Sequence, residues 1–530
     1  MLKFRKIAFV LSLMATPFGA NATEADTTAA IMQYKDCMYL NNVAYGNINP
    51  TFIKDLPIDA FATLEVSYGA GTGTITKAGK GAFHQLDKSG KTRDLNVSVY
   101  GVRKLRDVSF EGGMSYNNGK DNNRAWNATL YQSEQNPFML ADSLFSDYST
   151  EEFSLDGRFS WEPIELIRFG VNADYEVGTT SDEQDPRLET KGMLFTINPG
   201  IDFKVAEYVK IGATGGIRLF NENAKYSTVE TGNSASFFVM SGMGTCMDQG
   251  GTSYQREVKG LAYFADLQVY WQRPDYGNLL NIGFEKNREK ATDGGNTYQF
   301  LGGEYNNMKI SANERFSFTK GKFIHNFELG AAIEDIKGTW FYQENVTDPT
   351  TGQSQWVVMD QDDEKHLEKR MTGDFAYRLD VLSRTGQPSW SAGINAYFIN
   401  SDMKNNPSGY YQKYTNIKAG AFVKKTFQIK KSIFSLSVGG DYKMNLSNSF
   451  YMSQGERLRD KYTFPMFEYT TADFYDVYGK LETKIPIPGK KFKSYIGIFA
   501  EASTQRYIGD LDRFNKTAFN QFGGGANYTF

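Results

Sequence analysis

The chain has 530 residues and a formal net charge of -3 at pH 7, so it carries no basic excess and gives no indication of nucleic-acid binding. Aromatic residues make up 15% of it, glycine is abundant with 51 residues and cysteine is scarce with 2. Because no Pro/Ser-rich linker or composition shift divides the sequence, one continuous β architecture explains its uniformity better than several soluble domains.

Residues 1–22 have the pattern of a secretory signal peptide. Three cations within the first six residues precede an apolar run at 7–15 and the small-x-small cleavage site Ala20-Asn21-Ala22. Cleavage there makes Thr23 the first mature residue and, by removing those three cations, changes the formal charge from -3 to -6. The apolar run is shorter than the roughly 20 residues of a spanning helix, and no later stretch reaches that length. We therefore expect an exported protein without a transmembrane helix.

Residues 23–56 form a short segment that is too apolar for a tail in water. Its apolar residues include Met32, Tyr34, Cys37, Met38, Tyr39, Leu40 and Tyr45. We predict a small hatch that lies inside, or against the base of, the β structure that follows; the alternative is a lead-in whose aromatics only cover that base. An exported protein meets an oxidising environment, so Cys37 could form a disulfide with Cys246; the alternative is two separate thiols.

Residues 57–530 show the period of two that is typical of strands with one apolar and one polar face. Within 167–177, for example, apolar side chains alternate with Arg168, Asn172 and Asp174. The pattern recurs at 153–161, 261–271, 374–381, 417–423 and 475–485. A soluble antiparallel sheet has the same period, so the connections between strands must distinguish the two.

These connections alternate between tight turns and long polar loops. Tight turns are predicted at 105–106, 162–163, 205–206, 274–277, 319–322, 428–431 and 486–491. Long loops are predicted at 70–91, 118–148, 178–191, 221–256, 342–370 and 447–469, and 221–256 could hold a further hairpin. Outer-membrane barrels have short periplasmic turns and long extracellular loops. The sequence therefore predicts an all-β protein, a single transmembrane antiparallel barrel of about 18 strands (range 16–20) with both termini periplasmic.

The last residues of the chain agree with an outer-membrane barrel. Gly525, Tyr528 and Phe530 resemble the glycine-x-x-aromatic-x-aromatic signal read by the barrel-insertion machinery, although Gly523 occupies its usually polar first position. A terminal aromatic residue also suits the boundary between lipid and water. We therefore expect the protein in the outer membrane of a Gram-negative bacterium, in contact with outer-membrane lipid and lipopolysaccharide.

Over its mature length the chain resembles the large outer-membrane barrels of Bacteroidota, particularly a group of unknown function found beside TonB-dependent receptors. The features that carry the resemblance are Asn49-Pro50 before the first strand and the Gly-rich, aromatic-terminated last strand. The resemblance implies a barrel that accompanies a nutrient receptor, and it transfers no binding residue. The chain is unlike such a receptor itself, because residues 23–56 stand where a receptor has a large plug domain.

Nothing in the sequence resembles an enzyme active site, so we predict no catalytic residue, no metal ligand and no cofactor. His84, His325 and His366 have no partner at a metal-ligand spacing, and no catalytic triad is recognisable. His366 lies in the acidic stretch 360–369, which indicates a solvated loop more often than a calcium site. The glycine-rich run 69–73 lacks the lysine and helix of a phosphate-binding loop and indicates a flexible loop.

Function must therefore be inferred from the lumen, where the strand pattern predicts charges of both signs. These are Arg158, Arg168, Asp174, Arg218, Asp266, Arg378, Asp380, Lys443, Lys480 and Glu482. Opposed rows of charge could select solutes, which predicts a porin-like or gated channel for small hydrophilic solutes or nutrients. The same charges could instead pair across a closed lumen. That alternative predicts a non-conducting accessory or structural subunit of a larger outer-membrane complex, such as a TonB-dependent receptor assembly.

A third hypothesis is surface adhesion or ligand capture by the outer loops. It rests on Trp126, Trp340, Trp356 and Tyr410-Tyr411, which lie at predicted strand ends or in loops where aromatic rings can stack on sugars. The interpretation that we favour is that these residues belong to the interfacial aromatic girdle of the barrel.

Overall fold

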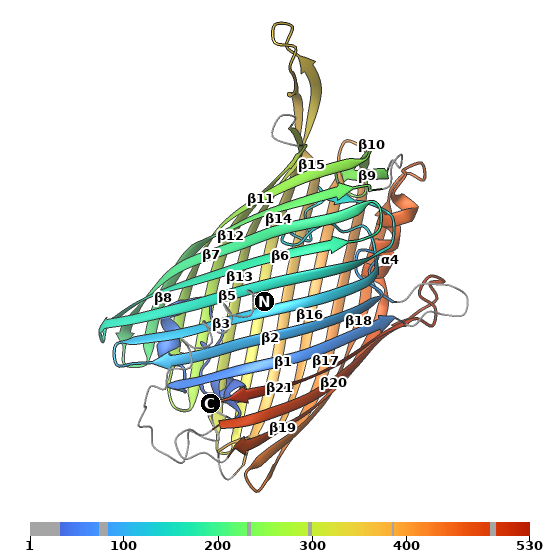
Figure 1. Cartoon of the computed structure of the whole chain (residues 1–530). Helices are drawn as coiled ribbons and strands as arrows, with labels where there is room; N and C mark the ends of the chain where they lie inside the picture. Colours follow the sequence, from blue (N-terminus) through green and yellow to red (C-terminus); the bar gives the residue numbers. More distant parts are fainter. Residues whose placement is uncertain (1–31, 74–82, 230–234, 295–298, 384–385, 488–493) are drawn as a thin grey trace.

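A closed ring of eighteen antiparallel strands makes up most of the protein. The computed structural model describes residues 32–73, 83–229, 235–294, 299–383, 386–487 and 494–530. The ring closes because β1 (Ala60–Gly73) pairs with both β2 (Lys91–Lys104) and β21 (Ala518–Thr529), as Figure 1 shows. The predicted eighteen-stranded β-barrel is thus confirmed. The signal peptide predicted at 1–22 lies outside the described residues.

The remaining elements follow in chain order around the ring. The other barrel strands are β3 (Val108–Arg124), β5 (Ser146–Ile164), β6 (Ile167–Asp182), β7 (Arg187–Ala206), β8 (Val209–Ser227), β11 (Ser253–Gln272), β12 (Tyr276–Asp293), β13 (Phe300–Lys320), β14 (Phe323–Thr347), β15 (Ser354–Leu382), β16 (Pro388–Asn405), β17 (Tyr410–Ile429), β18 (Ser432–Tyr451), β19 (Asp473–Ile487) and β20 (Ser494–Ile508). A separate small sheet contains β4 (Leu140–Ala141), β9 (Ala235–Met240) and β10 (Cys246–Gly251). Among the described residues, the helical elements are α3 (Tyr34–Asn41), the 3-10 helix η1 (Pro50–Asp55), the π-helical turn η2 (Arg459–Thr463) and α4 (Phe464–Thr471). Within the described ranges, no helix is both long enough and apolar enough to cross a bilayer.

The outward side chains of the strands form an apolar belt. In β11, Tyr263 and Leu267 are 55% and 63% exposed, whereas Phe264, Gln268 and Tyr270, which face the other way, are buried. Apolar residues are exposed in the same alternating manner on the other strands. Such an area of apolar surface would be unfavourable in water and fits the hydrocarbon of a bilayer. The barrel therefore has the outer wall of a membrane-spanning protein.

Short connections gather at one end of the barrel, which we call the short-turn end, and long connections gather at the other. The predicted turn at 162–163 is wrong by three residues, because β5 continues to Ile164 with an irregular register after Trp161. Pro163 is tolerated there because the end of a strand needs no further ladder donor. The turn predicted at 205–206 lies at 207–208, because β7 runs to Ala206.

Several segments predicted as loops are continuations of the barrel strands at the end opposite the short turns. β6 and β7 occupy most of 178–191, and β14 and β15 continue as a long hairpin that projects from the barrel (Figure 1). Outside the hydrocarbon, both faces of a strand meet water, so the backbone pairing continues without apolar alternation. The segment 221–256 does hold a further hairpin, β9–β10.

The glycine-rich run 69–73 is part of β1, so the prediction of a flexible loop was wrong. Gly71 sits where a Cβ would lie only 2.8 Å from the ring of Phe519, so this position accepts no larger side chain without displacement. Gly71 therefore leaves room for the Phe519 ring at the seam between β1 and β21. At the other end of that seam the Thr529 hydroxyl donates to the Thr63 hydroxyl over 2.9 Å.

Candidate functional site

The segment before β1 lies inside the ring at the short-turn end, and we call residues 32–56 the hatch segment. Tyr34 packs against Phe61 of β1, with ring centroids 4.7 Å apart, and Phe52 packs against Tyr270 of β11 at 5.3 Å. Met32 packs against β18 and β20. Because β1 and β11 lie on nearly opposite sides of the ring, the hatch segment must cross the lumen.

Asp55 fastens the end of η1 to one side of the lumen. Its carboxylate accepts hydrogen bonds from Arg168 of β6 at 2.9 Å and from Lys210 of β8 at 2.6 Å. Arg168 is only 3% exposed and also pairs with Asp202 of β7 at 2.9 Å. Burial alone would raise the pKa of Asp55, but the charges of Arg168 and Lys210 outweigh burial and lower it. We call this group the first latch.

Asp36 of α3 fastens the hatch segment to the other side. It accepts hydrogen bonds from Arg378 of β15 at 2.9 Å and from Lys424 of β17 at 2.7 Å. Arg378 also pairs with the buried Asp380 at 2.7 Å. Burial would raise the pKa of Asp36, but the charges of Lys424 and Arg378 lower it to about 2. We call this group the second latch.

Neutral and cation–π contacts complete the attachment of the hatch segment. The Asn49 side-chain amide donates to Gln268 of β11 over 3.1 Å and caps η1 by accepting from the backbone N–H of Thr51. Arg315 of β13 lies over the ring of Tyr39 at 3.9 Å and donates to the Tyr39 carbonyl. The hatch segment is therefore bound to the wall at separate polar points around the ring.

The two latches predict that acid weakens the hatch. Both carboxylates have a lowered pKa in the folded protein. Their contribution to the stability of hatch attachment is therefore complete above the ordinary aspartate pKa of 3.8. For Asp36, the contribution is lost as the pH falls from about 4 toward about 2, because protonation removes its pairing with Arg378 and Lys424. The charge of Lys484 on β19 also interacts with Asp36 and favours its ionised carboxylate. Pepsin is therefore expected to cleave the hatch segment of detergent-solubilised protein faster as the pH falls from about 4 to about 2.

The control for the acid experiment is Asp36→Asn/Asp55→Asn. This variant cannot gain a proton at either latch, so cleavage of its hatch segment should be fast and nearly independent of pH between 4 and 2. A wild-type hatch that stays as resistant at pH 2 as at pH 4 would show that the latches do not hold it.

Of the other charges predicted for the lumen, most lie beside an oppositely charged or amide partner. The contacts are Arg158 with Glu111 (3.8 Å), Arg218 with Glu285 (3.0 Å), Lys480 with Glu501 (3.1 Å), Glu482 with Lys484 (3.4 Å), Asp174 with Asn172 (2.6 Å) and Asp266 with Asn281 (2.9 Å). Lys443 instead donates to the carbonyls of Thr470 and Ala472, each at 2.7 Å, and so holds the end of α4. The structure thus uses these charges to pair strands and to hold inserted segments.

Long loops fold together over the opposite end of the lumen. We call residues 83–90, 125–145, 235–251 and 452–472 the outer cap. Trp126 of the second loop stacks on Phe238 of the third loop, with ring centroids 5.6 Å apart, and packs at a tilt against Tyr462 of the fourth loop at 5.2 Å. These rings belong to one buried apolar cluster, so the loops form one packed layer.

Two carboxylates of the barrel wall bind the loop 125–145. Glu222 of β8 accepts from the backbone N–H groups of Leu130, Tyr131 and Gln132 over 2.7 to 3.2 Å. Glu289 of β12 accepts from the Asn136 side-chain amide over 2.8 Å. Backbone donors that face the lumen therefore find acceptors in the wall, which fixes the course of the loop.

A buried ion pair adds a further anchor for the same loop. Arg256 of β11 and Asp293 of β12 are 1% and 2% exposed, and an Arg256 Nη atom lies 2.7 Å from Asp293 Oδ2. Arg256 also donates to the Phe138 carbonyl over 3.1 Å. The Phe138 side chain is fully buried in an apolar cluster that includes Trp340. The anchor therefore combines one ion pair with an apolar contact.

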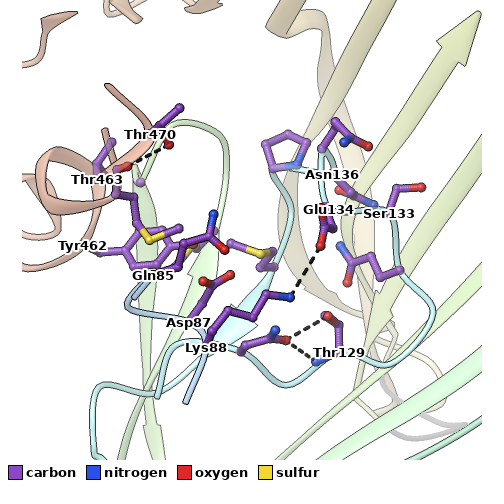
Figure 2. Close-up of a pocket in the computed structure, with 18 of the residues that line it drawn as sticks. Gln85, Asp87, Lys88, Thr129, Ser133, Glu134, Asn136, Tyr462, Thr463 and Thr470 are labelled. Carbon is purple, nitrogen blue, oxygen red and sulfur yellow. Dashed lines mark hydrogen bonds and ion pairs between the residues drawn. The ribbon is translucent and has the colours of Figure 1, made fainter. Parts of the chain in front are cut away.

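A cavity of about 610 Å³ lies within the outer cap and the adjoining barrel wall. Figure 2 shows Tyr462, Thr463 and Thr470 on one side of it and the loop with Ser133, Glu134 and Asn136 on the other. The stretch with Gln85, Asp87 and Lys88 lies between them, and Lys88 reaches Glu134 at 3.5 Å. Among the wall residues are Glu152 of β5, three residues of β15, and Gln412 and Tyr414 of β17. The cavity is thus polar and is built from segments far apart in the sequence.

The prediction that His366 lies in a solvated loop was wrong. His366, Glu368 and Arg370 lie at alternate positions of β15 and line the cavity, and the first two are only 1% and 2% exposed. The signal missed in the sequence was this alternation, because the preceding acidic residues gave the whole stretch a solvated character. His84 instead contacts the Gln85 carbonyl, and His325 stacks on Phe318. Within the residues that the structure describes, no cluster of three His, Cys, Asp or Glu could hold a metal ion.

Two further expectations from the sequence are corrected. Trp126 and Trp340 are buried inside the barrel end, so they belong neither to a lipid-facing girdle nor to an exposed adhesive surface. Cys37 packs near Tyr34 in the hatch segment, whereas Cys246 packs in the outer cap, and no disulfide joins them. Because the two cysteines lie in clusters at opposite ends of the lumen, the disulfide alternative is wrong.

Comparison with known families decides where the chain belongs. Residues 57–530 match a family described as Family of unknown function (DUF6850). The protein belongs to the DUF6850 family. The match covers every strand of this DUF6850 barrel, while the hatch segment precedes it. No curated protein sequence matches the chain.

Solved structures are similar to this DUF6850 barrel at low sequence identity. The RagAB peptide importer in its 'closed-closed' state is 8% identical, with a TM-score of 0.41, over 89% of this chain and 87% of that chain. The outer membrane transporter YddB from Escherichia coli is 8% identical, with a TM-score of 0.38, over 88% and 81%. A Pseudomonas aeruginosa FadL homologue is 11% identical, with a TM-score of 0.35, over 97% and 99%. These likenesses concern the barrel fold alone.

Proposed function

We propose that the protein is a gated outer-membrane channel for small hydrophilic solutes. The observation that carries the proposal is that inserted segments, which are not part of the ring of strands, occupy each end of the lumen, and that separable polar contacts fasten them to the wall. A barrel that served only as a rigid scaffold would need no such inserted segments. The polar cavity of about 610 Å³ gives a solute a place within the barrel. An always-open pore does not fit, because the hatch segment crosses the lumen.

The hatch segment and the outer cap lie one after the other along the lumen, so displacing one of them should leave the other in the path of a solute. We expect wild-type protein in planar bilayers to show rare, brief conductance steps. Asp36→Asn/Asp55→Asn should loosen the hatch without leaving Arg168 or Arg378 unpaired, because Asp202 and Asp380 remain. Combining it with Arg256→Met in the cap anchor should give frequent, long openings, more than either change alone. Single-channel recording checks this expectation.

The matched control is Asp348→Asn, which removes one carboxylate from the exposed tip of the β14–β15 hairpin. It should leave conductance at the wild-type level. Each variant is first checked for a folded barrel by its shift in gel migration on boiling. A folded combined variant that shows no conductance steps would overturn the channel proposal.

The projecting hairpin favours a second candidate, an accessory subunit of an outer-membrane complex. The hairpin of β14 and β15 projects beyond the barrel (Figure 1). Its exposed apolar side chains are Tyr342, Val346, Val358 and Met359. Exposed apolar side chains on a two-stranded ribbon are typical of a surface that contacts another protein. If the protein is such a subunit, shortening the hairpin would abolish its co-purification with a partner. The variant that combines Asp36→Asn/Asp55→Asn with Arg256→Met would then show no conductance steps.

A further inference from the structure

We infer that the cavity under the outer cap is a binding site for an uncharged, hydroxyl-rich solute, a mono- or disaccharide. The inference rests on the proposed function, whose solute class it names. The cavity volume of about 610 Å³ lies within the range of about 300–1,000 Å³ that is usual for small-molecule sites. The reasons for the ligand class are the unpaired polar atoms, the charges and the apolar residues of the wall.

Several residues that line the cavity carry buried polar atoms that no other described residue satisfies. His366 has neither ring nitrogen paired, and Glu368 uses one carboxylate oxygen to accept from Ser401 while its Oε2 has no partner. The Gln132 side-chain oxygen and the Nε atoms of Arg124 and Arg370 are likewise unpaired within the described chain. Buried polar groups are otherwise almost always hydrogen-bonded, so such a concentration around one cavity indicates a ligand with complementary groups.

The unpaired atoms include both donors and acceptors, which fits hydroxyl groups. Arg124 and Arg370 offer N–H donors, whereas Glu368 and Gln132 offer acceptors, and a hydroxyl can serve either kind. A solute that is only an anion would satisfy the arginines and leave the acceptors unpaired. A solute that is only a cation would satisfy the acceptors and leave the arginine donors unpaired. The cost of an unpaired buried group thus favours a solute that carries both functions at neighbouring atoms.

The charges on the wall exclude anions further and leave a neutral solute as the best fit. The carboxylates are Asp87, Asp94, Asp121, Glu134, Glu152 and Glu368, and the cations are Lys88, Arg124 and Arg370. The excess of carboxylates repels an anion, and the three cations interspersed among them oppose a polycation. Tyr414, Tyr462 and several methionines supply apolar contact for the C–H faces of a sugar ring. This combination matches a saccharide.

Isothermal titration calorimetry of the full-length protein in detergent tests the inference without requiring conduction. The probes are glucose, galactose, mannose, arabinose, maltose and lactose, with trialanine, spermidine and citrate as comparators. We expect saturable binding of at least one saccharide and weaker or no binding of the comparators. Glu368→Gln and Arg370→Gln should each weaken that binding about tenfold, since each removes a charged partner of a hydroxyl. Two variants are used so that one folding failure does not decide the outcome.

Glu285→Gln is the matched control, because Glu285 pairs with Arg218 in the lumen outside the cavity. It should bind the saccharide as the wild type does. Binding of trialanine, spermidine or citrate in preference to every saccharide, or no saturable binding at all, would overturn the inference. Equal weakening by Glu285→Gln and Glu368→Gln would overturn the placement of the site. Saccharide binding without any conductance steps would contradict the proposed channel function and would still support this binding site.

Discussion

Replacing Arg168 with methionine is expected to release the hatch segment from the lumen. The guanidinium joins Asp55 of the hatch segment to Asp202 of the wall, at 2.9 Å from each, and it is almost completely buried. Without it, two carboxylates would remain in a largely dry site, and Lys210 alone would compensate for them. Breaking a buried ion pair in this way costs about 3–5 kcal/mol. Most of that cost should fall on hatch closure, because the strands keep their backbone ladder.

Hydrogen–deuterium exchange measured by mass spectrometry checks this result in detergent micelles. Peptides of the hatch segment should lose most of their protection in Arg168→Met, while peptides of β6 and β7 keep theirs. The control Arg288→Met removes an exposed arginine that pairs with Glu304 at 2.6 Å, a contact worth at most about 1 kcal/mol. If hatch peptides exchange equally slowly in both variants, the first latch does not hold the segment.

A change of similar size is expected at the opposite end for Arg256→Met. This substitution leaves the carboxylate of Asp293, which is 2% exposed, without its ionic partner. It also removes one of two donors to the Phe138 carbonyl, the other being the side-chain amide of Gln132 within the same loop. The expected cost is again about 3–5 kcal/mol, and the loop 125–145 should come away from the wall. The neighbouring Tyr254 hydroxyl donates to Asp293 over 2.8 Å but carries no compensating charge. Proteolysis of intact protein should therefore cut this loop much faster than in the wild type.

The double variant Arg256→Met/Asp293→Leu separates the buried charge from the lost contact. Removing both ionic partners leaves no uncompensated carboxylate, so much of the protease resistance should return. If the double variant is as sensitive as Arg256→Met, the hydrogen bond to Phe138 holds the loop and the ion pair is secondary. If Arg256→Met itself stays resistant, the cap is held by its apolar clusters alone.

The barrel could be predicted from the sequence because lipid imposes a local pattern on every strand. Phe169, Val171 and Tyr175 of β6 face outward as the alternation indicated, while Arg168 and Asn172 are buried inside. Predictions failed where that constraint ends. The acidic stretch before His366 lies in the part of β15 that pairs with β14 alone, so water meets both faces and the strand there shows no apolar period.

The contacts that close the lumen could not be predicted, because ring closure brings their partners together from distant parts of the chain. Asp36 and Lys424 are 388 residues apart, and Asp55 and Arg168 are 113 apart. The strand pattern indicated that Arg168 and Arg378 face inward, but no local pattern indicates which inserted segment a charged side chain will meet. The cavity has the same origin, since its lining comes from strands and loops spread over most of the sequence.

The hatch segment is joined directly to β1, whose first residue lies at the same mouth that the segment closes. A detached segment would therefore stay tethered at that mouth and would never have to pass through the ring to return. Tethering of this kind holds the effective local concentration near the millimolar range. Reclosure would then be a unimolecular step whose rate does not depend on how much of the protein the membrane contains.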